Sequence, residues 1–560
     1  MTTSTETSKK THYKMKFRFI LSAALVAAAA LPVIAQTHVE GMEYYKADQH
    51  ANAKELLIRN HNNSGTDKAI SNYYQGLIAL KEGNNAEAEK FFNAGVQDNP
   101  NFGFNYVGLG AVDLKKGDKA AAEKQFKTAE GLAKKNAELQ IDIARAYYNA
   151  DPAAYAKEIE KRIEKARKIN MQDPDIYIFE GDRKKDNKDY GGAAGQYEMA
   201  ANYNPEATEA YVKYANLFTQ VNPEYAITML SKLLSLNPNS ALAQRELANS
   251  YYNANKFQEA ASEYGKYVQN PNHFKQDEDR YAFLLFYGGD YKKGYDYSTA
   301  LLKANPSNFT AQRYQYMNAS QPKAGVPADQ LLPMAEALVA AHKANPANKF
   351  APIDYILIAQ EFNGAKRPQE AEEILIEALK DNPDNAEFYK QLAMTYVGEN
   401  HLAKAADTFL GYIENTEKPG YNDYIQQATF AFYAGVENKA ENPEAAEKYY
   451  NMCLEYANKG KEILPSNYKP VKFAGDVAKQ RASEADVASA AVPFYTEAIT
   501  LLEGSDNPAR YATDAKEMYN YMGNYYLDQK DTANAKEYFN KYLQYDPDNE
   551  AYRKFVEGLK

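Results

Sequence analysis

The sequence is poor in cysteine and tryptophan: its 560 residues include one cysteine and no tryptophan. A single cysteine excludes a disulfide within the chain and a cysteine-rich metal site. Cys453 lies in the apolar stretch YYNMCLEYA, where we expect a buried thiol that packs as a small hydrophobic residue. The aromatic residues are instead 48 Tyr and 24 Phe, and we expect most of them to pack in the core.

Clusters of basic residues are also missing. The 65 Lys and Arg are outnumbered by 75 Asp and Glu, so the net charge is −10. Duplex nucleic acid is bound mainly by Lys and Arg that neutralise its phosphates, and this balance argues against a nucleic-acid partner. The 45% hydrophobic and 25% charged residues are typical of a folded protein and argue against a disordered chain.

The motifs of several enzyme classes are absent. The sequence contains no HExxH zinc motif, no glycine-rich phosphate loop and no Gly-x-Ser-x-Gly nucleophile motif. None of its seven histidines lies four residues from another, a spacing that would place two metal ligands on one helix face. We therefore expect no enzyme, no cofactor and no metal site.

The one long apolar run lies at the N-terminus. Residues 19–31 are apolar and follow basic residues, and small residues precede Ala35. This arrangement is typical of a Sec signal peptide, and a membrane anchor would need about 20 apolar residues. We expect residues 1–35 to be removed by cleavage after Ala35, with either Met1 or Met15 as the true start. No further run of membrane-spanning length follows, so we expect no transmembrane segment in the mature chain.

The rest of the chain repeats with a period of 34 residues. Four pairs share this spacing: Gly76 and Gly110, Gly83 and Gly117, Ala88 and Ala122, and Phe92 and Phe126. Within each unit, apolar residues recur three and four positions apart in two runs, which predicts two amphipathic helices. One such hairpin cannot bury its own apolar face, so we expect neighbouring units to stack in a row.

This pattern resembles the tetratricopeptide repeat, a helix pair with small residues and Tyr in the first helix and Ala and an aromatic residue in the second. The resemblance implies an all-α fold, an α-solenoid superhelix of about fourteen helix-turn-helix units. With the signal peptide, the chain resembles exported envelope proteins of Gram-negative bacteria that carry this repeat. That resemblance implies a periplasmic or secreted location.

Breaks in the repeat suggest how the array is divided. Residues 318–333 hold three prolines and a glycine, which predicts a long loop. Placing a boundary near residue 320 gives an N-terminal array, 36–320, and a C-terminal array, 321–549. Residues 550–560 are expected to form the polar-faced capping helix that the end of an array requires.

The resemblance also implies a binding face. In the repeat family the fifth position of the first helix faces a concave groove, and Arg245, Arg280 and Arg313 occupy it in three successive units, with Lys390 farther along. Other groove positions hold Asn216, Asn249, Tyr252 and Tyr287.

Two interpretations of this column stay open. In one, the cations hold an extended acidic or C-terminal peptide, because Arg presents a planar fork of donors suited to carboxylates. In the other, the Arg residues form ion pairs across the stack with Glu246, Asp279 and similar neighbours.

These observations predict a noncatalytic scaffold that binds protein or peptide partners in the cell envelope through its concave face. The alternative is a protein that binds envelope glycans or the cell wall by stacking sugars on Tyr-rich surfaces. One further motif, Asp531-Thr532-Ala533, resembles an acceptor that some Gram-negative bacteria glycosylate in exported proteins. Thr532 is therefore a candidate modification site.

Overall fold

The computed structural model describes residues 36–559, which fold into α-helices and three short 3₁₀ turns without a β-strand in that range. Packing divides this chain into two units, residues 36–281 and 282–559. The division falls inside a helix, whereas the loop that we expected near residue 320 lies within the second unit. The predicted signal peptide, residues 1–35, lies outside the described residues.

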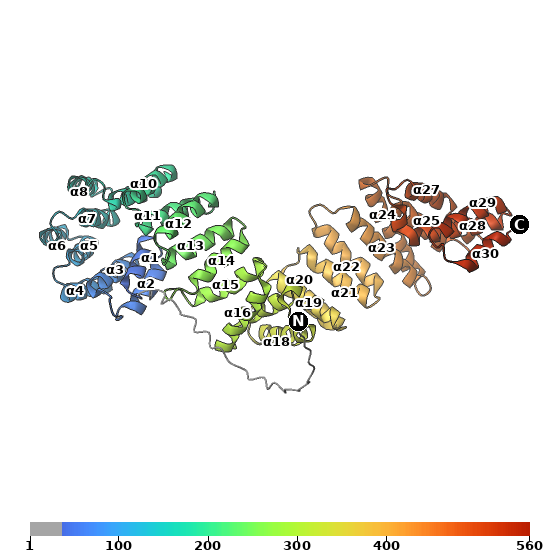
Figure 1. Cartoon of the computed structure of the whole chain (residues 1–560), viewed down its shortest axis with the longest axis horizontal. Helices are drawn as coiled ribbons and strands as arrows, with labels where there is room; N and C mark the ends of the chain where they lie inside the picture. The colour runs from blue at the N-terminus through green and yellow to red at the C-terminus, as the bar shows by residue number, and fades with distance from the viewer. Residues whose placement is uncertain (1–35, 560) are drawn as a thin grey trace, which may run out of the picture. The chain divides into compact units, whose positions relative to one another are not determined.

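Unit 1 is a row of helix pairs in which each helix packs on the next (Figure 1). Its helices are α1 (His38–Lys46), α2 (His50–Asn60), α3 (Lys68–Lys81), α4 (Asn85–Asp98), α5 (Gly103–Lys115), α6 (Lys119–Leu132), α7 (Ala137–Ala150), α8 (Ala156–Ile169), α9 (Pro174–Asp186), α10 (Tyr190–Tyr203), α11 (Thr208–Phe218), α12 (Pro223–Leu236), α13 (Ala241–Asn253), α14 (Phe257–Tyr267) and α15 (Gln276–Tyr287), within which the division falls.

Unit 2 continues the same pattern. Its helices are α16 (Tyr291–Ala304), α17 (Phe309–Ala319), η1 (Pro322–Ala324), η2 (Ala328–Gln330), α18 (Leu331–Ala344), α19 (Pro352–Gly364), α20 (Pro368–Asp381), α21 (Ala386–Gly398), α22 (Leu402–Asn415), α23 (Tyr421–Asn438), α24 (Pro443–Ile463), α25 (Lys469–Arg481), α26 (Val487–Ala490), α27 (Val492–Glu503), η3 (Pro508–Tyr511), α28 (Ala512–Asp528), α29 (Thr532–Gln544) and α30 (Glu550–Gly558). Helix α30 occupies the segment predicted to cap the array.

Local chemistry explains where the helices begin and turn. Asp118 accepts a hydrogen bond from the backbone N–H of Ala121 at 2.9 Å, which satisfies an amide that has no partner within the helix. Gly83 and Gly117 have φ angles of 80° and 81° in the turns after α3 and α5. Residues with a Cβ rarely adopt this left-handed conformation, so the backbone accounts for one of the 34-residue pairs.

Close helix crossings account for two more of these pairs. A Cβ atom placed on Gly110 would lie 2.4 Å from Cε1 of Phe126, and one on Gly76 would lie 2.4 Å from Cε1 of Phe92. Both rings are fully buried. A glycine in the first helix thus makes room for an aromatic ring of the second. The predicted all-α solenoid of stacked hairpins is confirmed within each unit.

The aromatic residues fill the core, as the composition suggested. The largest fully buried side chains are Tyr44, Tyr147, Tyr197, Tyr211, Tyr264, Tyr267, Tyr316, Tyr495, Phe92, Phe126, Phe179 and Phe274. Cys453 is also fully buried in unit 2, and this burial raises the pKa of its thiol. Across residues 36–559, no helix combines the length and the apolar character needed to cross a bilayer.

Candidate functional site

The predicted column of cations is divided between the two units. In unit 1, Arg245 on α13 is half-buried and donates from Nε to Asp277 Oδ2 at 2.7 Å. Its Nη1 donates to Gln49 Oε1 at 3.2 Å, and Glu246 lies 3.8 Å away. Arg245 therefore has ion-pair partners within its own unit, and the principal one is Asp277.

Arg313 on α17 of unit 2 is held in a similar way. Its Nε donates to Asp354 Oδ2 at 2.8 Å, and Asp354 is fully buried at the start of α19. Burial raises the pKa of Asp354, while the charge of Arg313 opposes that shift. Removing Arg313 would leave this carboxyl group without its cation.

The other predicted groove residues are more accessible. Arg280 is exposed, with its guanidinium 5.3 Å from the ring centroid of Tyr252. Lys390 lies 3.9 Å from Glu387. Three more residues of the column are exposed or half-buried: Asn216, Asn249 and Tyr287. A peptide-binding role for this column stays a prediction.

Thr532, the candidate modification site, is the first residue of α29 and is half-buried. Asp531 caps this helix by accepting a hydrogen bond from the backbone N–H of Asn534 at 3.1 Å. The role of Thr532 stays a prediction.

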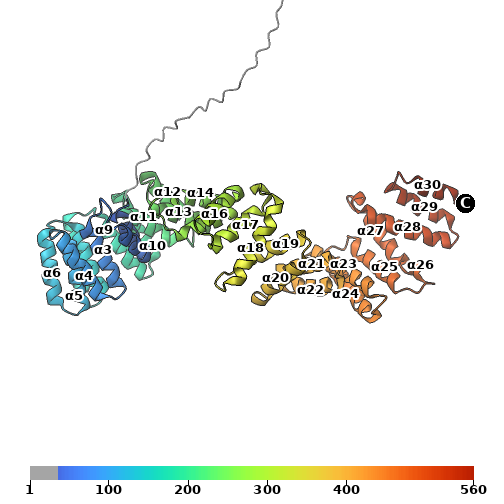
Figure 2. The ribbon, with the colours of Figure 1, turned by 90° about the horizontal axis from the view of Figure 1, so that it is seen from below.

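A long-range contact closes unit 1 on itself. Helix α1 packs against α11 and α13, and Figures 1 and 2 both place the α1–α2 hairpin beside α11. The fully buried ring of Tyr44 meets Phe274 edge-on, with ring centroids 5.4 Å apart. Gln49, in the turn between α1 and α2, donates to Glu246 at 2.7 Å. The concave face near Arg245 is therefore covered by the first hairpin of the chain.

Buried carboxyl groups of α1 take part in this closure. Glu43 accepts hydrogen bonds from the hydroxyl groups of Thr208 at 3.2 Å and Ser240 at 3.3 Å. Glu40 is only 9% exposed. Burial raises the pKa of Glu40 to about 8, and the neighbouring Glu43 adds to this rise. The closure thus favours a protonated Glu40.

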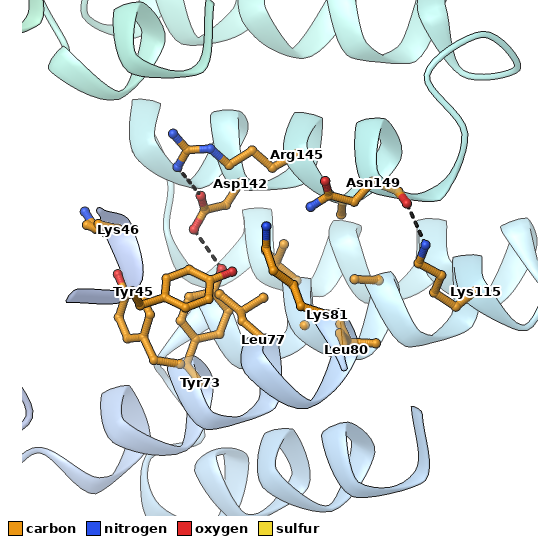
Figure 3. Close-up of a pocket in the computed structure, with 15 residues that line it drawn as sticks. Tyr45, Lys46, Tyr73, Leu77, Leu80, Lys81, Lys115, Asp142, Arg145 and Asn149 are labelled. Carbon is orange, nitrogen blue, oxygen red and sulfur yellow. Dashed lines mark hydrogen bonds and ion pairs between the residues drawn. The ribbon is translucent and has the colours of Figure 1, made fainter. Parts of the chain in front are cut away.

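An open cavity of about 250 Å³ lies between α1, α3, α5 and α7 (Figure 3). One wall is aromatic: the ring of Tyr74 lies 5.2 Å from that of Tyr45 and 5.3 Å from that of Tyr73, centroid to centroid. Val107 and Ala111 of α5 add an apolar surface. The volume is below the roughly 300–1,000 Å³ of most small-molecule sites, so it suits one or two side chains of a peptide.

Two ammonium groups border this cavity without a carboxylate partner in the described chain. Lys81, at the end of α3, is exposed and forms no ion pair there, and Figure 3 shows its side chain rising from α3 towards α7. Lys115, at the end of α5, donates to the backbone oxygen of Asn149 at 2.6 Å. Their positive charges are available to an anionic ligand.

The deeper charges compensate one another. Arg145 lies 3.3 Å from Asp142 and 3.7 Å from Asp175, and Lys46 lies 3.9 Å from Asp175. The hydroxyl of Tyr73 donates to Asp142 at 2.7 Å. Burial raises the pKa of Asp142, and Arg145 opposes this rise. This inner layer orients the aromatic wall and adds little net charge.

A smaller hollow of about 150 Å³ adjoins the cavity and shares Lys81 and Arg145 with it. Asp48 accepts hydrogen bonds here from Lys185 and Lys213, each at 2.9 Å. Burial alone would raise the pKa of Asp48, but the two lysines hold it well below its ordinary value. Asp48 follows α1, so the same ion pairs also fasten the first hairpin.

The cavity residues were not among those predicted from the sequence. The adjacent pair Tyr73-Tyr74, with Lys81 two turns later on the same helix, was a usable signal. The contribution of Tyr45 depends on the closure of α1 against α11, and no local pattern encodes that contact.

The comparisons with known proteins agree with the repeat. Residues 217–273 and residues 363–422 each match a family model of the tetratricopeptide repeat. The chain therefore contains tetratricopeptide repeats in both units. No curated protein matches its sequence significantly.

Several solved structures are similar to this chain. The C-terminal part of a TPR repeat-containing protein from Cytophaga hutchinsonii is 16% identical with a TM-score of 0.40, covering 50% of this chain and 99% of that one. A TPR protein from Thermus thermophilus is 17% identical with a TM-score of 0.24, covering 37% and 98%. Yeast Tom70 is 13% identical with a TM-score of 0.29, covering 93% and 98%.

Proposed function

We propose that this protein is an exported, noncatalytic scaffold that binds a protein partner by holding an acidic peptide segment in the cavity of unit 1. The tetratricopeptide repeats support a role in protein interaction. The observation that carries the site is the aromatic wall of Tyr45, Tyr73 and Tyr74 beneath the uncompensated charges of Lys81 and Lys115.

Recognition would combine two contributions. A hydrophobic side chain of the peptide packs against the tyrosine rings, and neighbouring Glu or Asp carboxylates pair with Lys81 and Lys115. Because stacked helices already hold the wall in place, little conformational entropy is lost by the scaffold on binding. The exposed ion pairs are screened by salt, so we expect a complex that weakens as ionic strength rises.

The proposed location is the cell envelope, which rests on the signal-peptide pattern of residues 1–35. Cell fractionation followed by N-terminal sequencing tests it. We expect the periplasmic or secreted fraction to contain a chain that begins at Gln36. Recovery of an uncleaved chain from the cytoplasm alone would reject export.

Peptide binding is tested by fluorescence anisotropy with a labelled peptide that has one Phe flanked by Glu residues. We expect Lys81→Glu to weaken binding at least tenfold, because it places a like charge beside the peptide carboxylates. Lys90→Glu is the matched control, since Lys90 is exposed on α4 and does not line the cavity. Equal affinities for the two variants would reject this site.

A further inference from the structure

Unit 2 contains a second, wider pocket that the peptide-binding proposal does not use. It has a volume of about 810 Å³ and lies between α23, the turn before α25, and the start of α28. This volume is within the roughly 300–1,000 Å³ of ligand sites. Its lining combines three tyrosines, two asparagines and a threonine with Lys469, Arg510 and Asp514.

Tyrosine rings form the walls of this pocket. Tyr468 is buried, and its ring centroid lies 5.0 Å from that of Tyr511 at an interplanar angle of 62°. Tyr421 and Tyr511 are only half-buried. The two half-buried rings therefore present apolar surface to a ligand in the pocket.

Several polar side chains around the pocket have hydrogen-bonding capacity to spare. Asn467 uses its Oδ1 to accept from the backbone N–H of Lys469 at 3.0 Å, which leaves its amide N–H groups available. Within residues 36–559, the exposed side chains of Asn422 and Thr513 have no hydrogen-bond partner. Arg510 is exposed and has no carboxylate partner in the same range.

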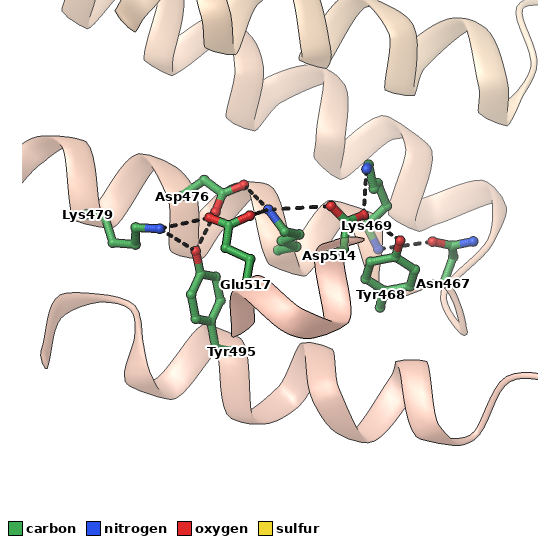
Figure 4. A network of polar contacts seen from close by, with 9 residues as sticks. Asn467, Tyr468, Lys469, Asp476, Lys479, Tyr495, Asp514 and Glu517 are labelled. Carbon is green, nitrogen blue, oxygen red and sulfur yellow. Dashed lines mark hydrogen bonds and ion pairs between the residues drawn. The ribbon is translucent and has the colours of Figure 1, made fainter. Parts of the chain in front are cut away.

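A network of charges fixes the inner side of the pocket (Figure 4). Asp514 accepts from the hydroxyl of Tyr468 at 2.6 Å and from Lys469 at 2.7 Å. Behind it, the buried Lys472 lies 2.9 Å from Asp476 and 3.8 Å from Asp514.

This network keeps Asp514 ionised and pairs it internally. Burial would raise the pKa of Asp514, but its hydrogen bonds from Lys469 and Tyr468 and the charge of Lys472 hold it below the ordinary value. The one carboxylate of the pocket is thus already paired, whereas Arg510 is free. The pocket has a surplus of positive charge and a preorganised tyrosine wall.

We propose that this pocket binds an oligosaccharide that carries carboxylate groups, such as a chain of uronic acids. The C–H groups on one face of a sugar ring pack against the half-buried Tyr421 and Tyr511. Sugar hydroxyls both donate and accept hydrogen bonds, which matches the amides of Asn422 and Asn467. The carboxylate pairs with the planar guanidinium of Arg510.

An acidic peptide is the competing ligand, and the composition of the pocket argues against it. Peptide carboxylates need cations, which Arg510 and Lys469 supply, but they make no use of unpaired amide and hydroxyl groups spread around a wide, open pocket. A ligand with many hydroxyls uses all of these groups. This site belongs to unit 2, so it is independent of the proposed peptide site in unit 1.

Isothermal titration of the mature chain with three probes of equal length tests the proposal. The probes are trigalacturonate, maltotriose and triglutamate. We expect trigalacturonate to bind at least tenfold more tightly than maltotriose, because only the former has a partner for Arg510. Binding of triglutamate alone, or no binding of trigalacturonate, would overturn the proposal.

Two variants locate the binding. Arg510→Gln and Tyr511→Ala should each weaken trigalacturonate binding at least fivefold, and Arg510 is exposed enough for its replacement to leave the fold intact. Tyr433→Ala is the matched control, because Tyr433 is 51% exposed on α23 and does not line the pocket. Lys81→Glu in unit 1 should leave trigalacturonate binding unchanged. Equal loss in Tyr433→Ala and Tyr511→Ala would reject the pocket as the site.

Discussion

Unit 1 and unit 2 are both rows of stacked helix pairs, yet they bury the ends of the row differently. In unit 2, packed helices are neighbours or next neighbours along the chain, such as α23 with α24 and α25. In unit 1, α1 also packs against α11 and α13. The same hairpin therefore builds an open row in one unit and a row closed by its own first hairpin in the other.

This difference has energetic and functional consequences. In an open row, stability is approximately a sum of the units and their neighbouring interfaces. Closure adds an interface between the two ends of unit 1, so a change in α1 is felt in α13. The closing hairpin also covers the concave face near Arg245 and leaves the cavity bordered by Lys81 and Lys115.

The largest expected effect separates the closed unit from the open one. Tyr44→Ala and Tyr495→Ala both remove a fully buried aromatic ring, and each should lower the free energy of unfolding by about 3–5 kcal/mol. Hydrogen exchange should show that Tyr44→Ala loosens α11 and α13 as well as α1. Tyr495→Ala should loosen only the helices around α27. Loss of protection confined to α1 and α2 in Tyr44→Ala would contradict the closure.

The next prediction compares two members of the cation column. Arg313→Ala should destabilise unit 2 by about 3 kcal/mol, because it leaves the buried Asp354 without its cation. Arg280→Ala should change stability by less than about 0.5 kcal/mol, because Arg280 is exposed. Chemical denaturation of the two variants measures both values. Equal stabilities would show that the Arg313 pair is not structural.

A smaller effect is expected where glycine allows a close helix crossing. Gly110→Leu should destabilise unit 1 by about 1–3 kcal/mol, because the new side chain overlaps Phe126. Gly131, at a similar position along the chain on α6, has no atom within 4 Å of an added Cβ. Gly131→Ala should therefore stabilise the helix by about 0.5–1 kcal/mol. Thermal unfolding that ranks the two variants in the opposite order would refute the packing explanation.

The smallest predicted effect concerns the pH dependence of the closure. The pKa of Glu40 rises from an ordinary 4.5 to about 8 in the fold, so its contribution to stability is full below pH 4.5 and is lost as pH rises through 8. Glu40→Gln should match the natural protein at pH 5 and exceed its stability at pH 9 by on the order of 1 kcal/mol. Glu123→Gln, an exposed change on α6, is the control. A stability difference for Glu40→Gln that does not vary with pH would contradict the raised pKa.

The sequence predicted the repeat well because the repeat is local. Gly110 and Phe126 belong to one hairpin, and the 34-residue spacing marks their contact directly. The cavity was not predictable in the same way, because the contribution of Tyr45 follows from contacts such as that of Tyr44 with Phe274, which lies more than 200 residues away. Arg245 shows the same limit: its position on the helix was visible, but its pairing with Gln49 depends on the closure.

Hydrogen exchange of the mature chain with and without the labelled acidic peptide tests the account of unit 1 most directly. The account predicts that the bound peptide slows exchange in α3, α5 and α7, whose residues line the cavity, and leaves α13 and α17 unchanged. Slowed exchange in α13 and α17 with no change in α3, α5 and α7 would contradict it and would assign binding to the Arg245 and Arg313 column.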